Sequence, residues 1–236
     1  MTPETLAAVM EATWPPAATR RVGPWRVRDG QGGGKRVSAA TAEGEWTAQD
    51  IPAAEAAMAA LGQAPLFLIR SGDEVLDLSL ADCGYGVVDL VVAYSAPVAR
   101  LVDPAPSGMA AFAHWPPLAI ARTIWEEAGI GPARIAVMAR VSGPHVALLG
   151  RTGERPSGAA FVAIHRQTAM LHALEVVPSH RRQGSAQKMV RAAAVWAQAN
   201  GADTLSLVVA KANTTAVLLY ASLGMEAVGQ YHYRQK

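Results

Sequence analysis

The segment from Leu174 to Gln187 combines a basic loop with a glycine at the start of a predicted helix. Its apolar residues predict a buried strand, and Pro178 ends that strand because proline has no backbone N–H to donate. Backbone N–H groups at the start of the following helix have no partner within the helix, so they can bind an anion. Gly184 and Ala186 leave room for a phosphate, and two arginines in the loop add positive charge. The segment therefore predicts a phosphate-binding turn.

A second pair of polar residues lies on a helix predicted from Asn213 to Leu223. Asn213 can cap this helix, since asparagine is favoured at that position, and a capping side chain can also touch a ligand. Tyr220 follows seven residues later among apolar neighbours. Its ring can belong to the core, or its hydroxyl can donate a proton to a leaving group. Both interpretations of each residue remain open.

Taken together, these segments resemble the GCN5-related N-acetyltransferase (GNAT) family. The R-x-x-G-x-A stretch that begins at Arg181 matches the family's R/Q-x-x-G-x-G/A signature, and the preceding Leu-Glu-Val-Val-Pro is similar to the strand before that turn. The stretch from Asn213 through Tyr220 is similar to the family's N-x-x-A-x-x-L-Y-x-x-x-G-F. The resemblance covers about Ala119 to Arg234 and implies a GNAT acyl-CoA N-acyltransferase fold.

The resemblance also implies how acetyl-CoA is held. The strand would pair with the pantetheine arm as an added strand does, the turn would hold the pyrophosphate, and Asn213 would contact the cofactor near the pantetheine. Tyr220 would protonate or hydrogen-bond the departing thiolate. The implied cofactor-binding residues are Leu174, Glu175, Val176, Arg181, Arg182, Gln183, Gly184, Ser185, Ala186, Gln187 and Asn213.

The general base is the least defined part of the predicted site. Many relatives carry a glutamate on the strand equivalent to Thr204–Ala210, but here Thr204 and Ser206 are its polar side chains. His172 and Glu175 lie on the strand before the turn, and regular strand alternation places them on opposite faces. Glu175 is the candidate base, directly or through water, and a structural carboxylate is its alternative role. The predicted catalytic residues are therefore Tyr220 and Glu175.

The expected function is N-acetyl transfer, in which a primary amine attacks acetyl-CoA directly in a ternary complex. A small amine, an amino acid, a peptide N-terminus and a lysine side chain remain open as acceptors. The alternative is a non-catalytic acyl-CoA-binding regulator that keeps the turn but lacks a base. The six histidines form no HxH or HExxH motif, so no metal is expected.

The elements that must position these residues follow from apolar periodicity and turn signals. A hairpin tip is expected at 29–34, between strands at 25–27 and 37–39. Strands followed by a strand–helix–strand–helix–strand run predict a mixed α/β sheet covered by helices. The further predicted helices are 5–13, 51–61, 73–81, 117–128, 185 onward and 213–223, and the further predicted strands are 65–69, 86–94, 135–141, 145–150, 159–165, 169–177, 204–210 and 227–233.

The length of 236 residues allows one large or two small domains. Turn formers from Asp103 to Gly108 mark the expected boundary, with a degenerate GNAT-like or accessory α+β domain at 1–102 and a catalytic GNAT domain at 103–236. The tandem form is preferred to one GNAT domain with an unrelated extension. The second domain alone is then expected to keep its cofactor turn.

Composition limits the partners. A net charge of +2 is too small to predict a nucleic-acid-binding face. No stretch reaches the roughly 18 apolar residues of a membrane span, and the N-terminus lacks a basic leader, so a cytoplasmic protein is expected. The single cysteine, Cys83, cannot form an internal disulfide and is expected to be a buried thiol. The oligomeric state is left open.

Overall fold

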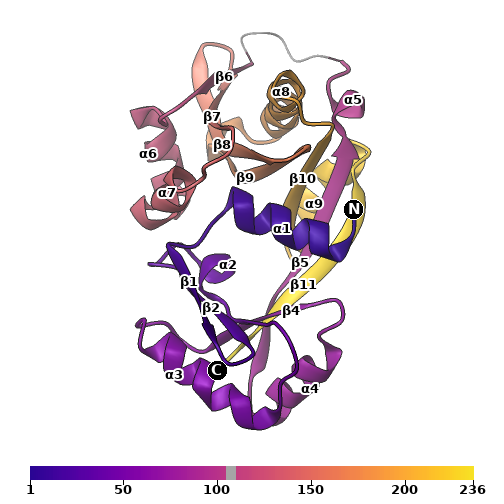
Figure 1. Ribbon diagram of the computed structural model, residues 1–236. Helices are drawn as coiled ribbons and strands as arrows, with labels where there is room; N and C mark the ends of the chain where they lie inside the picture. The colour runs from indigo at the N-terminus through magenta and orange to yellow at the C-terminus, as the bar shows by residue number, and fades with distance from the viewer. Residues whose placement is uncertain (105–109) are drawn as a thin grey trace.

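The computed structural model describes residues 1–104 and 110–236. An eight-stranded sheet runs through both halves of the chain, and a three-stranded sheet lies in the first half. Helix α1 (Pro3–Thr13) crosses the middle of the molecule, between the helices that gather at its two ends (Figure 1). Parallel and antiparallel pairs occur in the larger sheet, which confirms the predicted mixed α/β class. Most of the expected boundary, at 105–108, lies outside the described residues.

The second half builds its part of the sheet from an antiparallel run followed by a crossover. Here β6 (Ala111–His114) pairs with β7 (His145–Thr152), β7 with β8 (Arg155–His165), and β8 with β9 (Thr168–Val176). The crossover helix α8 (Ser185–Ala199) then allows β10 (Thr204–Ala210) to lie parallel to β9. Helix α9 (Thr214–Ser222) leads to the last strand, β11 (Glu226–Gln235). Between β6 and β7 lie α6 (Ala119–Glu127) and α7 (Pro132–Ala139).

The first half repeats this order on a smaller scale. An antiparallel three-stranded sheet is followed by helix, strand, helix and strand. A parallel bridge joins Ala40 to Phe67, as β9 and β10 are parallel in the second half. The elements after α1 are β1 (Ala18–Val22), β2 (Trp25–Asp29), α2 (Lys35–Ser38), β3 (Thr41–Ala42), α3 (Ile51–Ala59), β4 (Leu66–Arg70), α4 (Glu74–Asp82), β5 (Gly86–Pro97) and α5 (Val98–Leu101).

The two halves exchange their last strands. The sheet order β4-β11-β5-β10 places β5 between β10 and β11, and it places β11 between β4 and β5. Tyr94 of β5 pairs with Leu207 of β10 on one side and with Ala227 of β11 on the other. The expected domain boundary after residue 102 therefore divides the sequence into two halves, but strands of both halves belong to one continuous eight-stranded sheet.

Helices cover both faces of the second half. Met189, Val190 and Ala193 recur on one side of α8 and are buried against alternate residues of β7, β8 and β9. The intervening residues of these strands, such as Phe161, pack against Trp125 of α6 and the apolar side of α7. This arrangement leaves β9 buried on both faces as it approaches the predicted phosphate turn.

Most predicted elements are confirmed, but two are wrong. The segment 135–141 is largely helical, because Pro132 starts α7 and Val137 and Met138 are buried on its inner side. The hairpin joins β1 to β2, with Gly23 in its turn, and the glycine run that follows leads into α2 instead. At Gly33 an added Cβ would lie 2.5 Å from the Val137 side chain, so only glycine allows this close approach.

Cys83 is exposed, which contradicts the expected buried thiol, because it follows α4 at its solvent-facing C-terminal end. Across the described ranges, every helix is too short or too polar to cross a bilayer.

Candidate active site

Strands β9 and β10 separate within the sheet. Their parallel pairing runs from Thr168 and Thr204 to Leu171 and Leu207, and it ends there although both strands continue. The following residues of β9 leave one edge of their backbone open toward β10. Such an open edge is what the strand that carries Leu174 and Val176 would need to pair with a pantetheine arm, as the family resemblance implied.

A bulge in β9 accompanies the separation. Ala173 has a φ of 50°, and the pairing with β8 shifts by one residue between Ala159 and Phe161. The indole N–H of Trp125 donates a hydrogen bond of 2.8 Å to the Ala173 carbonyl oxygen, which fixes the bulge from the side of α6. The open edge of β9 is therefore held by packing, not by pairing with β10.

The bulge corrects the expected directions of two side chains. Glu175 pairs with Ala159 and His172 pairs with Phe161, and these two partners stand on the same face of β8. His172 and Glu175 thus share one face of β9, whereas regular alternation predicted opposite faces. The extra residue of the bulge is the physical reason for the difference.

The predicted phosphate turn follows directly. Arg182 and Gly184 have φ values of 61° and 77°, and α8 begins at Ser185 with no side-chain cap from the described residues. An added Cβ at Gly184 would meet no atom within 4 Å, so the turn is open on that side. The first N–H groups of α8 therefore point out of the turn, as an anion site requires.

Side chains in the turn have separate roles. Ser185 is buried, and its hydroxyl contacts the Thr152 hydroxyl at 2.7 Å and the His180 carbonyl oxygen at 3.1 Å. Only the Ser185 backbone is left to face a ligand. The Arg181 Nε donates to the Val176 carbonyl oxygen at 3.1 Å, which links the turn to the end of β9.

A cavity of about 510 Å³ lies beside the open edge of β9 and extends to the first half of the chain. Leu174, Glu175, Asn213 and Tyr220 all line it, so the structure brings these predicted residues together. The residues of the phosphate turn do not line this cavity.

Tyr220 is buried, and burial raises the pKa of its hydroxyl to about 12, with a further contribution from the negative charge of Glu175. Its ring lies 6.0 Å from that of Tyr94, centroid to centroid. The hydroxyl therefore keeps its proton near neutral pH and can donate it.

Glu175 is partly buried, and burial raises the pKa of its carboxyl group, while the charges of Arg181 and Arg134 act in the opposite direction. A higher pKa makes the carboxylate a better proton acceptor. Asn213 caps α9, since its side-chain oxygen accepts a 3.1 Å hydrogen bond from the Ala216 N–H. The capping role is thus present, and its amide Nδ2 is not used by this cap.

Sequence reasoning missed the residues that the first half, α7 and β11 contribute to the cavity. They are brought there by the strand exchange and by the packing of α1, α2 and α7, for which no local motif exists. His232 of β11 does not line this cavity, and its Nε2 contacts Asp77 Oδ1 at 2.7 Å. The missed lining residues that carry polar or aromatic groups are Trp14, Lys35, Arg36, Asp89, Arg134, Tyr231 and Tyr233.

The fold, the separated strands and the glycine turn define an acyltransferase of the GNAT type. The family model described as "Acetyltransferase (GNAT) family" matches residues 104–225, slightly over half of the chain. The chain belongs to this family.

Whole-length relatives agree with this assignment. The chain is 26% identical over 250 residues to the uncharacterized N-acetyltransferase YobR of Bacillus subtilis, covering 99% of this chain and 97% of the relative. The fold is similar to that of a GCN5-related N-acetyltransferase from Kribbella flavida, with a TM-score of 0.72, 19% identity and coverage of 99% and 95%. It is also similar to a tandem GNAT protein from the clavulanic acid biosynthesis pathway, with a TM-score of 0.61, 14% identity and coverage of 98% and 87%.

Proposed function

We propose that the protein transfers an acetyl group from acetyl-CoA to a primary amine. One arrangement carries the proposal: the open edge of β9 leads into the turn at the start of α8, and the same edge borders a cavity lined by Glu175 and Tyr220. A turn suited to phosphate, an open strand edge and a candidate proton donor and acceptor would together serve an acyl-CoA donor.

Acetyl-CoA fits these residues. Backbone groups from Leu174 to Val176 would pair with the pantetheine amides, as in strand addition. Backbone N–H groups of the turn 181–187 would hold the pyrophosphate, and Arg182 adds a positive charge beside them. Asn213 would contact the cofactor through Nδ2 while its oxygen caps α9.

Acetyl-CoA supplies a thioester whose C–S bond breaks as the amine nitrogen bonds to the acetyl carbon. A carboxylate oxygen of Glu175 accepts the proton that the amine loses, directly or through water. The Tyr220 hydroxyl donates a proton to the departing sulfur, and its high pKa keeps that proton available. Both residues line the same cavity, beside the open edge of β9.

The amine must be neutral to attack. At pH 7 this costs about 4.6 kcal/mol for a lysine side chain, whose pKa is about 10.4, but only about 1 kcal/mol for an α-amine with a pKa near 7.8. A single carboxylate base such as Glu175 is better matched to the α-amine.

The domain assignment remains part of the proposal, with a degenerate GNAT-like domain at 1–102 and a catalytic GNAT domain at 103–236. The first half follows the same order of elements, but the segment between β3 and α3 carries Glu43, Glu45 and Asp50 where the second half has its basic turn. Acidic side chains there would repel a pyrophosphate. The proposal therefore gives one cofactor site per chain.

A non-catalytic acyl-CoA-binding regulator is the alternative, because β10 lacks the glutamate common in relatives. A CoA-release assay with a small amine, an amino acid, a peptide N-terminus and a lysine side chain separates the two functions. We expect at least one class to raise CoA release well above the rate with solvent alone. Tight acetyl-CoA binding with no response to any class would favour the regulator.

A further inference from the structure

Arg36 is a cation at the proposed acceptor cavity that has no carboxylate partner. It lies in α2, in the first half of the chain, and lines the cavity beside His172 and Glu175. Its Nη1 donates to His172 Nδ1 at 3.1 Å, and its guanidinium carbon lies 6.0 Å from the centre of the Trp14 ring. Within the described residues, no carboxylate oxygen lies within 4.0 Å of its nitrogens.

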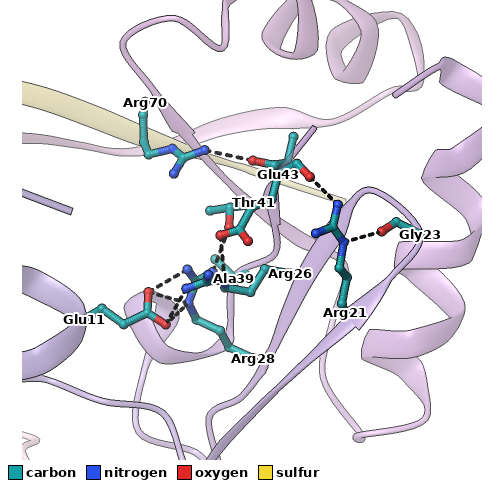
Figure 2. Close-up of polar contacts among 10 residues, drawn as sticks. Glu11, Arg21, Gly23, Arg26, Arg28, Ala39, Thr41, Glu43 and Arg70 are labelled. Carbon is teal, nitrogen blue, oxygen red and sulfur yellow. Dashed lines mark hydrogen bonds and ion pairs between the residues drawn. The ribbon is translucent and has the colours of Figure 1, made fainter. Parts of the chain in front are cut away.

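Two neighbouring arginines of the first half, Arg26 and Arg28, form ion pairs with glutamates. Figure 2 shows a neighbouring cluster, in which Arg28 is held by Glu11 at 2.8 Å and by the Ala39 carbonyl oxygen at 2.9 Å. Arg26 contacts Glu43 at 2.6 Å in the same cluster. This contrast matters because a partly buried guanidinium normally has an anionic partner. Among the described residues, Arg36 has no anionic partner at the cavity where the proposed acceptor would bind.

His172 orients Arg36 without neutralising it. Arginine can only donate, so His172 Nδ1 is the acceptor, and Nε2 therefore carries the proton toward the Thr13 hydroxyl at 3.0 Å. Thr13 in turn donates to the Val9 carbonyl oxygen at 2.6 Å. This chain of hydrogen bonds requires a neutral histidine and fixes the direction of the guanidinium.

Arg134 is a second cation on the same wall. It lies in α7 with its guanidinium beside Gly34, next to α2, and it too has no ion pair among the described residues. Lys35, which also lines the cavity, is paired with Asp89 at 2.8 Å. The cavity is therefore lined by Glu175 on β9 and by two guanidinium groups that have no ion pair among the described residues, a partly buried one at Arg36 and an exposed one at Arg134.

We propose that the acceptor amine also carries a carboxylate, as a free amino acid does, and that Arg36 and Arg134 bind this carboxylate. This inference rests on the proposed function and names the substrate class of the same site. The two guanidinium groups present N–H donors that match carboxylate oxygens, while Glu175 receives the amino group. The first half of the chain then selects the acceptor, and the second half holds acetyl-CoA.

The test compares each of several α-amino acids with its α-amide under acetyl-CoA saturation. The wild-type protein should acetylate the acids with a kcat/KM at least about 10-fold above that of the amides, as a charged hydrogen bond implies. In Arg36→Met the KM for acids should rise about 10- to 100-fold, while kcat/KM for amides stays within about threefold. Arg36→Lys should retain part of the preference, and Arg122→Met on the exposed face of α6 should behave as the wild type.

Three outcomes would overturn the inference: equal use of acids and amides, an unchanged preference in folded Arg36→Met, or better use of amines that carry a phosphate ester. A binding measurement separates this failure from failure of the proposed function. Calorimetry of the CoA-saturated protein should show that an N-acetyl amino acid binds at least about 10-fold more tightly than its amide, whether or not turnover occurs. Equal binding contradicts the inference, whereas preferential binding without any turnover supports it and contradicts the proposed function.

Discussion

His172 and Glu175 lie on the same face of β9 although three positions separate them, because the bulge at Ala173 inserts one extra residue between them. Through His172 this face contacts Arg36 of the first half, and at Glu175 it meets the proposed amine site. The bulge thus lies between the cavity wall that carries Arg36 and the open edge of β9 that would bind the cofactor.

The phosphate turn can be tested with a matched pair of glycines. Gly184→Asp should weaken acetyl-CoA binding by at least about 2 kcal/mol, because a carboxylate would stand against the pyrophosphate. Gly201→Asp is the control, since Gly201 also has a positive φ and open space but lies at the far end of α8. Calorimetry of both variants checks the assignment, and equal affinities in folded proteins would refute it.

Removal of the Tyr220 hydroxyl should affect turnover more than binding. Tyr220→Phe should lower kcat about 10- to 1000-fold and leave acetyl-CoA affinity within a few-fold, because the proton is needed when the thiolate leaves. Tyr94→Phe removes a hydroxyl from the neighbouring ring and should retain kcat. Steady-state kinetics with calorimetry would assign Tyr220 to packing if binding and turnover fell together.

Protonation of Glu175 should produce the acid limb in the pH profile of kcat/KM. Its pKa is raised by burial, so kcat/KM should fall as the pH drops through a value above the ordinary 4.5, and Glu175→Gln should abolish that limb together with most of the rate. Glu127→Gln, at an exposed position of α6, should leave the profile unchanged. An intact acid limb in Glu175→Gln would exclude Glu175 as the base.

The same raised pKa predicts an effect on stability. The folded state binds a proton more tightly than the unfolded state, so the contribution of Glu175 is present below the unfolded pKa and is lost as the pH rises through the folded value. At pH 7 the charged carboxylate therefore lowers the free energy of unfolding. Glu175→Gln should unfold at the same or a higher temperature than the wild type, and a clear decrease in Tm would indicate a structural ion pair instead.

The strand exchange changes what truncation should do. A fragment of residues 103–236 lacks β5. Without it, β10 and β11 would present unpaired edges that are prone to aggregation. We expect this fragment to be insoluble alone and soluble when it is co-expressed with residues 1–102. A folded, monomeric fragment with full acetyl-CoA affinity would show that β5 is dispensable.

The parts of the site that depend on local sequence could be predicted. Pro178 and Gly184 mark the turn, and the spacing of Asn213 and Tyr220 places both on one helix; the structure gathers Glu175, Asn213 and Tyr220 around one cavity. Local propensity specifies such features because neighbouring residues form them.

Long-range features could not be predicted in this way. The positive φ of Ala173 occurs where Trp125, far away in the sequence, donates a hydrogen bond to its carbonyl oxygen, and alanine itself has no preference for that conformation. Arg36 reaches the cavity only because the glycine run leads into α2 and not into a hairpin tip. The exchange of β5 and β11 is a matter of pairing between distant strands, for which neither strand carries a signal of its own.

Direct acetyl transfer in a ternary complex is tested most directly by initial velocities measured while acetyl-CoA and a carboxylate-bearing amine are both varied. Mass spectrometry should quantify the acetylated amine. It should also give the mass of the intact protein after incubation with acetyl-CoA alone. We predict intersecting double-reciprocal plots, an acetylated amine equal in amount to the CoA released, and an unmodified protein. Parallel plots with an acetylated protein, or no acetylated amine at all, would contradict the account.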